Sequence, residues 1–329
     1  MSRMTHLRRL VALGATLGLT LVLTVAVTGQ ASVRHVADPC RGDGPISAAT
    51  LARTPHVGCS LTGRTVRHGS VSVVVPPIGV SAAGKGLSTR GDLVGLRVTN
   101  TGHGVTVSTG PAPLTAAGAG EQASRATSPS ACRDRTFRLE GHRWRTSYRY
   151  RLNLAHRPGS FRTATVVRQV KAANRNMRLG VNTCGRRHIG APAAKYRGRT
   201  AKKADITTTR TTVGCGSYNT TNVVAFGNLP GNLLGWTCYW WITGGRMNAA
   251  DVMMDNGHAL TTRIPAGCVN RWDFEGALTH EMGHVYGLAH TGSGHDNLTM
   301  QHMLLPCSTY ARTLGLGDWL GMKKLYGVR

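Results

Sequence analysis

Acidic residues are scarce in this sequence. Its 329 residues include 14 Asp and Glu against 40 Lys and Arg, which gives a formal net charge of +26 and a pI near 11.0. Such a balance favours acidic partners such as nucleic acid or an anionic cell envelope. The sequence has no dense Lys/Arg run with interleaved aromatic residues, however, and its arginines are scattered. We therefore expect no nucleic-acid partner, whereas an anionic cell envelope stays open as a partner.

Cys-x-x-Cys pairs are also missing, which argues against a structural zinc knuckle. The chain has eight cysteines, and an even number favours disulfide bonds in an exported protein. The sequence leaves their connectivity open, and we predict pairing between neighbours along the chain. Cys268 with Cys307 is the best-reasoned pair because the two bracket a histidine cluster. Cys40 is expected to pair with Cys59.

The start of the chain has the pattern of an export signal. A basic stretch precedes an apolar run over 10–27, and the small residues Gly29 and Ala31 occupy the two positions that a signal peptidase reads. We predict a signal peptide over 1–31 and a secreted, extracellular protein. An uncleaved membrane anchor over 10–27 is the alternative, and it too leaves the rest of the chain outside.

The remaining chain divides into two regions of different composition. Residues 32–110 contain short β-branched runs broken by Gly and Pro, which predicts a β-rich accessory domain or propeptide. Residues 111–131 are small, polar and Pro-containing, which is typical of a linker. Residues 132–329 alternate strand-like and helix-like patterns, which indicates a mixed α+β domain. The strands predicted there lie at 142–154, 221–229, 234–242 and 248–256. Three helices are predicted: one at 161–177, one from an N-cap at Asp273 to about Gly287, and one at 317–327 with Asp318 as its cap.

Three histidines and a glutamate lie within "HEMGHVYGLAH" (280–290). On a helix His280 and His284 share one face, so both can aim an imidazole nitrogen at one point. Gly287 can adopt a positive φ and end the helix, which lets His290 return as a third ligand. This geometry suits Zn²⁺, and three neutral ligands leave a fourth position for water, which marks a catalytic site. Glu281 lies close enough to hold that water.

The motif resembles the H-E-x-x-H-x-x-G-x-x-H signature of the metzincin zinc endopeptidases. Met300 in "HDNLTMQHM" resembles the methionine of their downstream turn, with Met303 a weaker candidate. The closing "LGLGDWLGMKKLYG" is similar to the last helix of the matrixin branch, and "HRWRTSYRYRLN" to its opening strand. The resemblance covers about residue 132 to the C-terminus.

The resemblance implies a metzincin-like catalytic domain: a twisted mixed sheet, an active-site helix, a turn with a methionine and a C-terminal helix. It implies a secreted zinc metalloendopeptidase that binds one catalytic zinc ion through His280, His284 and His290. Glu281 would be general base and then proton shuttle. Met300 would form a hydrophobic floor below the metal. The substrate would be a peptide or protein, bound in extended form along an edge strand by a monomeric enzyme.

The sequence also departs from the matrixin pattern. The stretch around Cys40, "DPCRGDGP", has the wrong order for the cysteine motif that blocks zinc in matrixin propeptides. Structural calcium sites would have to use Asp205, Asp251 and Asp255, and so few acids leave such a site unsupported. The Trp-rich 236–241 could line a substrate cleft as an edge strand, or Trp236 and Trp240 could simply pack in the core.

Two other functions stay open. The first is an extracellular, envelope-associated binding or adhesion protein with a vestigial zinc site. The intact set of His280, Glu281, His284 and His290 counts against it, because a decayed site would most easily lose the glutamate. The second is a zinc amidase that acts on peptidoglycan, which the high positive charge permits and the metzincin signature disfavours.

Overall fold

The computed structural model describes residues 38–55, 58–91, 95–109 and 128–329. The predicted signal peptide, the alternative anchor and most of the predicted linker lie outside these residues. Among the described residues, none of the helices is both long and apolar enough to cross a membrane. We call residues 38–109 the N-terminal region and residues 128–329 the C-terminal region.

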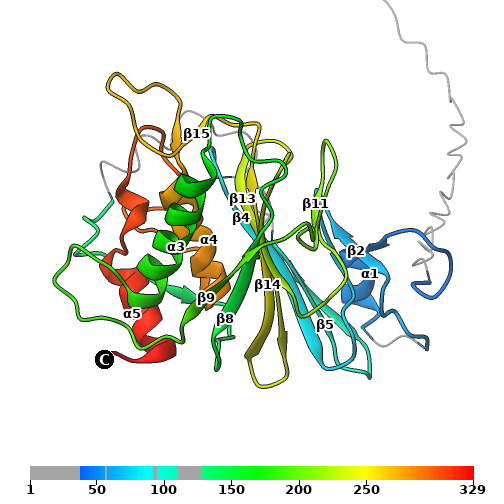
Figure 1. Ribbon diagram of the computed structural model, residues 1–329. Helices are drawn as coiled ribbons and strands as arrows, with labels where there is room; N and C mark the ends of the chain where they lie inside the picture. Colours follow the sequence, from blue (N-terminus) through cyan, green and yellow to red (C-terminus); the bar gives the residue numbers. More distant parts are fainter. Residues whose placement is uncertain (1–37, 56–57, 92–94, 110–127) are drawn as a thin grey trace, which may run out of the picture. The chain divides into compact units, whose positions relative to one another are not determined.

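An eight-stranded mixed sheet lies at the centre of the fold (Figure 1). Its strand order is β6-β5-β4-β13-β14-β12-β8-β9. Strands β9, β8, β12 and β14 run parallel to one another, whereas β13 is antiparallel to both β14 and β4. The strands are β4 (Val80–Ser88), β5 (Leu96–Asn100), β6 (Val105–Thr109), β8 (Tyr148–Leu152), β9 (Ala194–Arg199), β12 (Asn222–Gly227), β13 (Leu233–Ile242) and β14 (Arg246–Asp255).

Different layers cover the two faces of this sheet (Figure 1). Three helices cover one face: α3 (Thr163–Leu179), α4 (Phe274–Tyr286) and α5 (Leu316–Tyr326). A smaller sheet of order β1-β2-β3-β11-β10 covers the other, together with α1 (Ala48–Arg53). Its strands are β1 (Ile46–Ser47), β2 (Thr65–His68), β3 (Val71–Val74), β10 (Ile206–Thr208) and β11 (Val213–Cys215). The short elements β7 (Arg138–Leu139), β15 (Leu260–Thr261), β16 (Trp272–Asp273), β17 (Leu288–Ala289) and η1 (Tyr310–Arg312) complete the fold.

The residues that cap α4 are those predicted from the sequence. The carboxylate of Asp273 accepts a hydrogen bond from the backbone N–H of Gly276 at 2.7 Å. Gly287 ends the helix with φ 102°, a conformation that glycine adopts at no steric cost. The cap predicted for the last helix was wrong, because α5 begins after Gly315. Asp318 lies in the first turn, where its carboxylate accepts the backbone N–H of Gly315.

The N-terminal region is rich in β-strands, and these strands belong to the same sheet as the C-terminal region. Strand β4 pairs with β13 along nearly its whole length, so β13 has a neighbour on each side. Of the two alternatives for 236–241, the edge strand is therefore wrong and the packing of Trp236 and Trp240 in the core is confirmed. Trp236 and Trp240 are buried between the two sheets, and Tyr239 and Trp241 face the helices. Successive side chains of β13 point to opposite faces of the sheet, so this strand contributes to the core under the helices and to the core between the two sheets.

Four disulfide bonds join the cysteines in neighbouring pairs: Cys40–Cys59, Cys132–Cys184, Cys215–Cys238 and Cys268–Cys307. The predicted pairing between neighbours is confirmed, and no cysteine is left free. The first bridge lies within the N-terminal region and the other three within the C-terminal region. The two regions are therefore not cross-linked to each other by a disulfide.

Candidate metal centre

The structure brings the three histidines of the motif together. His280 and His284 project from successive turns of α4, and His290 follows β17, which pairs with β7. The Nε2 atom of His290 lies 3.0 Å from Nε2 of His280 and 3.0 Å from Nε2 of His284. All three side chains are buried, and their nitrogen atoms converge on one point.

Backbone carbonyl groups hold two of the rings in orientation. Nδ1 of His280 lies 2.7 Å from the carbonyl oxygen of Thr299, and Nδ1 of His284 lies 2.9 Å from that of Leu288. A carbonyl can only accept, so each Nδ1 carries the proton and each Nε2 presents a lone pair to the centre. These carbonyl contacts are the ones that orient metal-binding histidines in proteins.

Burial keeps the three rings neutral. It lowers the pKa of His284 to about 4 and those of His280 and His290 well below the ordinary value. With Nε2 of His280 and His284 unprotonated, His290 can donate a hydrogen bond to only one of them. The cluster therefore leaves buried lone pairs facing one another, which is costly unless a cation binds between them. Neutral imidazole nitrogens so arranged fit a zinc ion, which takes them at about 2.0–2.1 Å.

Glu281 lies between the two helical histidines in sequence and is fully buried. Its Oε2 accepts a hydrogen bond from the Thr237 hydroxyl at 2.6 Å, and its Oε1 accepts one from the backbone N–H of Leu87 at 3.1 Å. Burial raises the pKa of Glu281 to about 8, although both hydrogen bonds act in the opposite direction. Gly235 of β13 lets the carboxylate come this close, because a Cβ there would lie 2.5 Å from Oε1.

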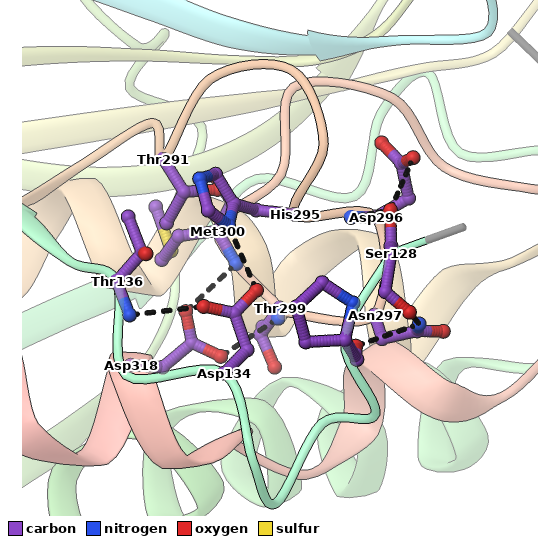
Figure 2. Close-up of polar contacts among 11 residues, drawn as sticks. Ser128, Asp134, Thr136, Thr291, His295, Asp296, Asn297, Thr299, Met300 and Asp318 are labelled. Carbon is purple, nitrogen blue, oxygen red and sulfur yellow. Dashed lines mark hydrogen bonds and ion pairs between the residues drawn. The ribbon is translucent and has the colours of Figure 1, made fainter. Parts of the chain in front are cut away.

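Met300 packs against the helix that carries the histidines. It is buried, and a side chain on Gly283 of α4 would collide with its sulfur atom. Its backbone N–H and that of Thr299 donate to the carboxylate of Asp318, at 3.1 and 2.7 Å (Figure 2). Sequence reasoning missed this role of Asp318, because its partners lie in a different part of the chain.

The loop before Met300 is tied to the start of the C-terminal region. Nδ1 of His295 lies 2.8 Å from Asp134, and the carboxylate of Asp296 accepts a hydrogen bond from Ser128 at 2.9 Å (Figure 2). Asp134 also accepts the backbone N–H of Thr136 at 3.0 Å. His295 therefore braces the loop and does not belong to the group of three converging histidines.

A second buried carboxylate, Glu140, was also missed. It bonds to Lys85 at 2.5 Å and to Arg97 at 2.9 Å, both from the N-terminal region. Burial by itself would raise the pKa of Glu140, but the positive charge of Lys85 and its hydrogen bond lower it to about 2. Lys85 and Arg97 lie far from Glu140 in a sequence rich in basic residues, so no local pattern predicts that the three side chains meet.

The three carboxylates considered for calcium do not converge on one point, although those of Asp205 and Asp251 interact with each other. Asp255 accepts hydrogen bonds from the backbone of Leu229 and from His258, and Asp251 accepts from the backbone of Asp205 and of Val223. Across the described ranges, the three histidines form the only group of three or more His, Cys, Asp or Glu side chains close enough to share an ion. The structure thus lends the calcium site no support.

Comparison with known proteins gives a partial match. No family model matches the chain. A stretch of 108 residues is 29% identical to a protein of Pyricularia oryzae named "Extracellular metalloprotease". This chain is similar to a metalloprotease. The match covers 33% of this chain and 34% of the relative, so the chain spans about a third of the length of that protein.

Proposed function

We propose that the protein is a secreted zinc endopeptidase with a metzincin-like, matrixin-like catalytic region. The observation that carries the proposal is the convergence of three neutral, buried Nε2 atoms, from His280, His284 and His290. Glu281 is buried on the same helix as two of these histidines. The similarity to a protein named as an extracellular metalloprotease supports the same class of function. The export signal predicted over 1–31 agrees with it.

Zinc bound by the three Nε2 atoms would lower the pKa of a water molecule and polarise the carbonyl group of the peptide bond that is cleaved. The proton transfers are carried out by a residue of the chain. Glu281 accepts the proton of the attacking water on a carboxylate oxygen and later gives it to the leaving amine. Burial favours the protonated form of its carboxyl group, which suits the uptake of a proton from water. The Thr237 hydroxyl fixes the direction in which the carboxyl group points.

Other residues hold this arrangement in place. The carbonyl groups of Thr299 and Leu288 orient two of the ligands, and Asp318 fixes the backbone of Thr299. Met300, which is buried and packs against Gly283 of α4, would form the apolar floor below the metal. Such supporting contacts matter, because misplacing a metal ligand lowers metal affinity by about 10–100-fold.

The experiment compares three forms of the secreted chain: unmodified, Glu281→Gln, and Glu275→Gln as a matched control on the same helix. Zinc content is measured by elemental analysis. Casein cleavage is measured before and after brief trypsin treatment that is stopped with a trypsin inhibitor. We expect one zinc ion per chain in all three, and a loss of about 10²–10⁴-fold in cleavage for Glu281→Gln only. A folded chain without zinc, or equal cleavage by the Glu281→Gln variant, would refute the proposal.

A further inference from the structure

Strand β4 of the chain itself pairs with the edge of β13 along which a peptide substrate would bind. A substrate that binds in extended form adds a strand to a free sheet edge. Here β4 takes that edge, antiparallel to β13, with Gly86 opposite Trp236 and Leu87 opposite Gly235. The end of β4 thus lies where an extended peptide would run past Glu281.

The same stretch of β4 is bound on its other side by the segment 302–304, which follows Met300. Ser88 forms a parallel bridge with Met303. Its N–H donates to the carbonyl oxygen of His302 at 3.2 Å, and its carbonyl accepts the N–H of Leu304 at 3.0 Å. The chain here therefore makes backbone hydrogen bonds on both sides, as a peptide held in a cleft between two walls would.

This stretch also engages the proposed catalytic base. The N–H of Leu87 donates to Oε1 of Glu281 at 3.1 Å, while Thr237 occupies Oε2. The side chains of His280, Glu281 and His284 are fully buried, and His290 is only 8% exposed. The site is closed, and one of the groups that closes it is the backbone of β4.

Two features keep the stretch in place. Lys85 bonds through Nζ to the buried Glu140, which anchors β4 to the C-terminal region. Gly86 allows close contact with β13, because a Cβ at this position would collide with the carbonyl oxygen of Gly235. A larger residue at position 86 would push the two strands apart.

We propose that residues 85–88, which we call the inhibitory segment, occupy the place of an extended peptide substrate and keep the protease inactive until they are displaced. This inference rests on the proposed function. The substrate that competes with the segment is an extended peptide that runs antiparallel to β13. No disulfide joins the N-terminal region to the C-terminal region, so one cut between residues 109 and 132 leaves the segment held by non-covalent contacts alone.

The first test is the variant Gly86→Ala in the full chain, loaded with zinc. Its matched control is Gly44→Ala, because Gly44 lies in the same region and a Cβ there would meet no atom within 4 Å. We expect Gly86→Ala to raise casein cleavage roughly tenfold or more, equivalent to about 1.4 kcal/mol of lost segment binding. Gly44→Ala should match the unmodified chain.

A second measurement uses the unmodified chain and does not depend on the folding of that variant. The probe is a tripeptide hydroxamate, which combines an extended backbone with a zinc-binding group. Amide hydrogen exchange at residues 86–88 is followed by mass spectrometry as the probe is added. We expect these amides to be protected in the free chain and to exchange faster once the probe has displaced the segment.

The outcomes separate the two proposals. Zinc-dependent cleavage that is equally fast in the unmodified chain and in a folded Gly86→Ala variant would overturn the inhibitory segment and leave the protease intact. Tight binding of the probe with unchanged protection at residues 86–88 would do the same. A folded, zinc-loaded chain that neither cleaves casein nor binds the probe, in any form, would overturn the proposed function and this inference with it.

Discussion

Oδ1 of Asp318 accepts a hydrogen bond from the backbone N–H of Met300 at 3.1 Å, although the two residues lie 18 positions apart in the sequence. Oδ2 of the same carboxylate accepts the backbone N–H groups of Thr299 and Gly315, at 2.7 and 2.9 Å. Through Thr299, whose carbonyl group contacts His280, a residue of the last helix fixes the ring of a proposed metal ligand.

Replacing Asp318 should therefore weaken both the fold and the metal site. Asp318→Ala leaves three buried N–H groups without their acceptor, at about 1–3 kcal/mol each when unsatisfied. We expect the free energy of unfolding in urea to fall by at least about 3 kcal/mol. Zinc affinity, measured by competition with a chromogenic chelator, should fall by about 10–100-fold.

The control for this variant is the exposed Asp43, whose replacement by alanine should change stability by no more than about 0.5 kcal/mol. If Asp318→Ala bound zinc as tightly as the unmodified chain, the contacts from Asp318 through Thr299 to His280 would not contribute to zinc affinity.

Removal of the metal should destabilise the fold. Without an ion, the three Nε2 atoms face one another in a buried site. At a free zinc concentration 100 times Kd, binding stabilises the native state by about 2.7 kcal/mol. Chelation should then lower Tm by about 5–10 °C, and added zinc should restore it. Scanning calorimetry measures the shift, and His284→Ala should show no response to zinc.

The contact between Glu140 and the N-terminal region predicts a pH dependence. The pKa of Glu140 is lowered from 4.5 to about 2 in the folded protein, so its ionised form stabilises the fold above pH 4.5. This contribution, about 3 kcal/mol, is lost as the pH falls from 4.5 through 2. The unmodified chain should be more stable than Glu140→Gln at pH 6, and the difference should shrink over that interval. A difference that stays constant from pH 6 to pH 2 would exclude this origin.

The turn between α4 and His290 needs glycine. Gly287 has φ 102°, and a Cβ there would also collide with the carbonyl oxygen of His142. We expect Gly287→Ala to lose at least about 1–2 kcal/mol of unfolding free energy, and its zinc affinity to fall as His290 moves. Gly159→Ala, where a side chain would meet no atom within 4 Å, should be neutral. Equal zinc affinity in the two variants would show that this turn does not position His290.

Helix α4 shows how much local sequence can predict. Asp273 supplies a side-chain acceptor at the start of the helix, and Gly287 permits the left-handed conformation at its end. The four-residue spacing of His280 and His284 then places both on one face. All of these are interactions between residues close in sequence, so the motif itself sets the helix and the proposed metal ligands.

The sequence by itself thus determined α4 and the positions of the three histidines, whereas it favoured pairing between neighbouring cysteines and left their connectivity open. Only the tertiary structure decided that β4 pairs with β13, that Leu87 bonds to Glu281 and that Lys85 meets Glu140. These contacts join residues 55 or more positions apart, and the hydrogen-bonding groups of a strand backbone are the same in every sequence. The backbone therefore gives no local sign of which strand will be its neighbour.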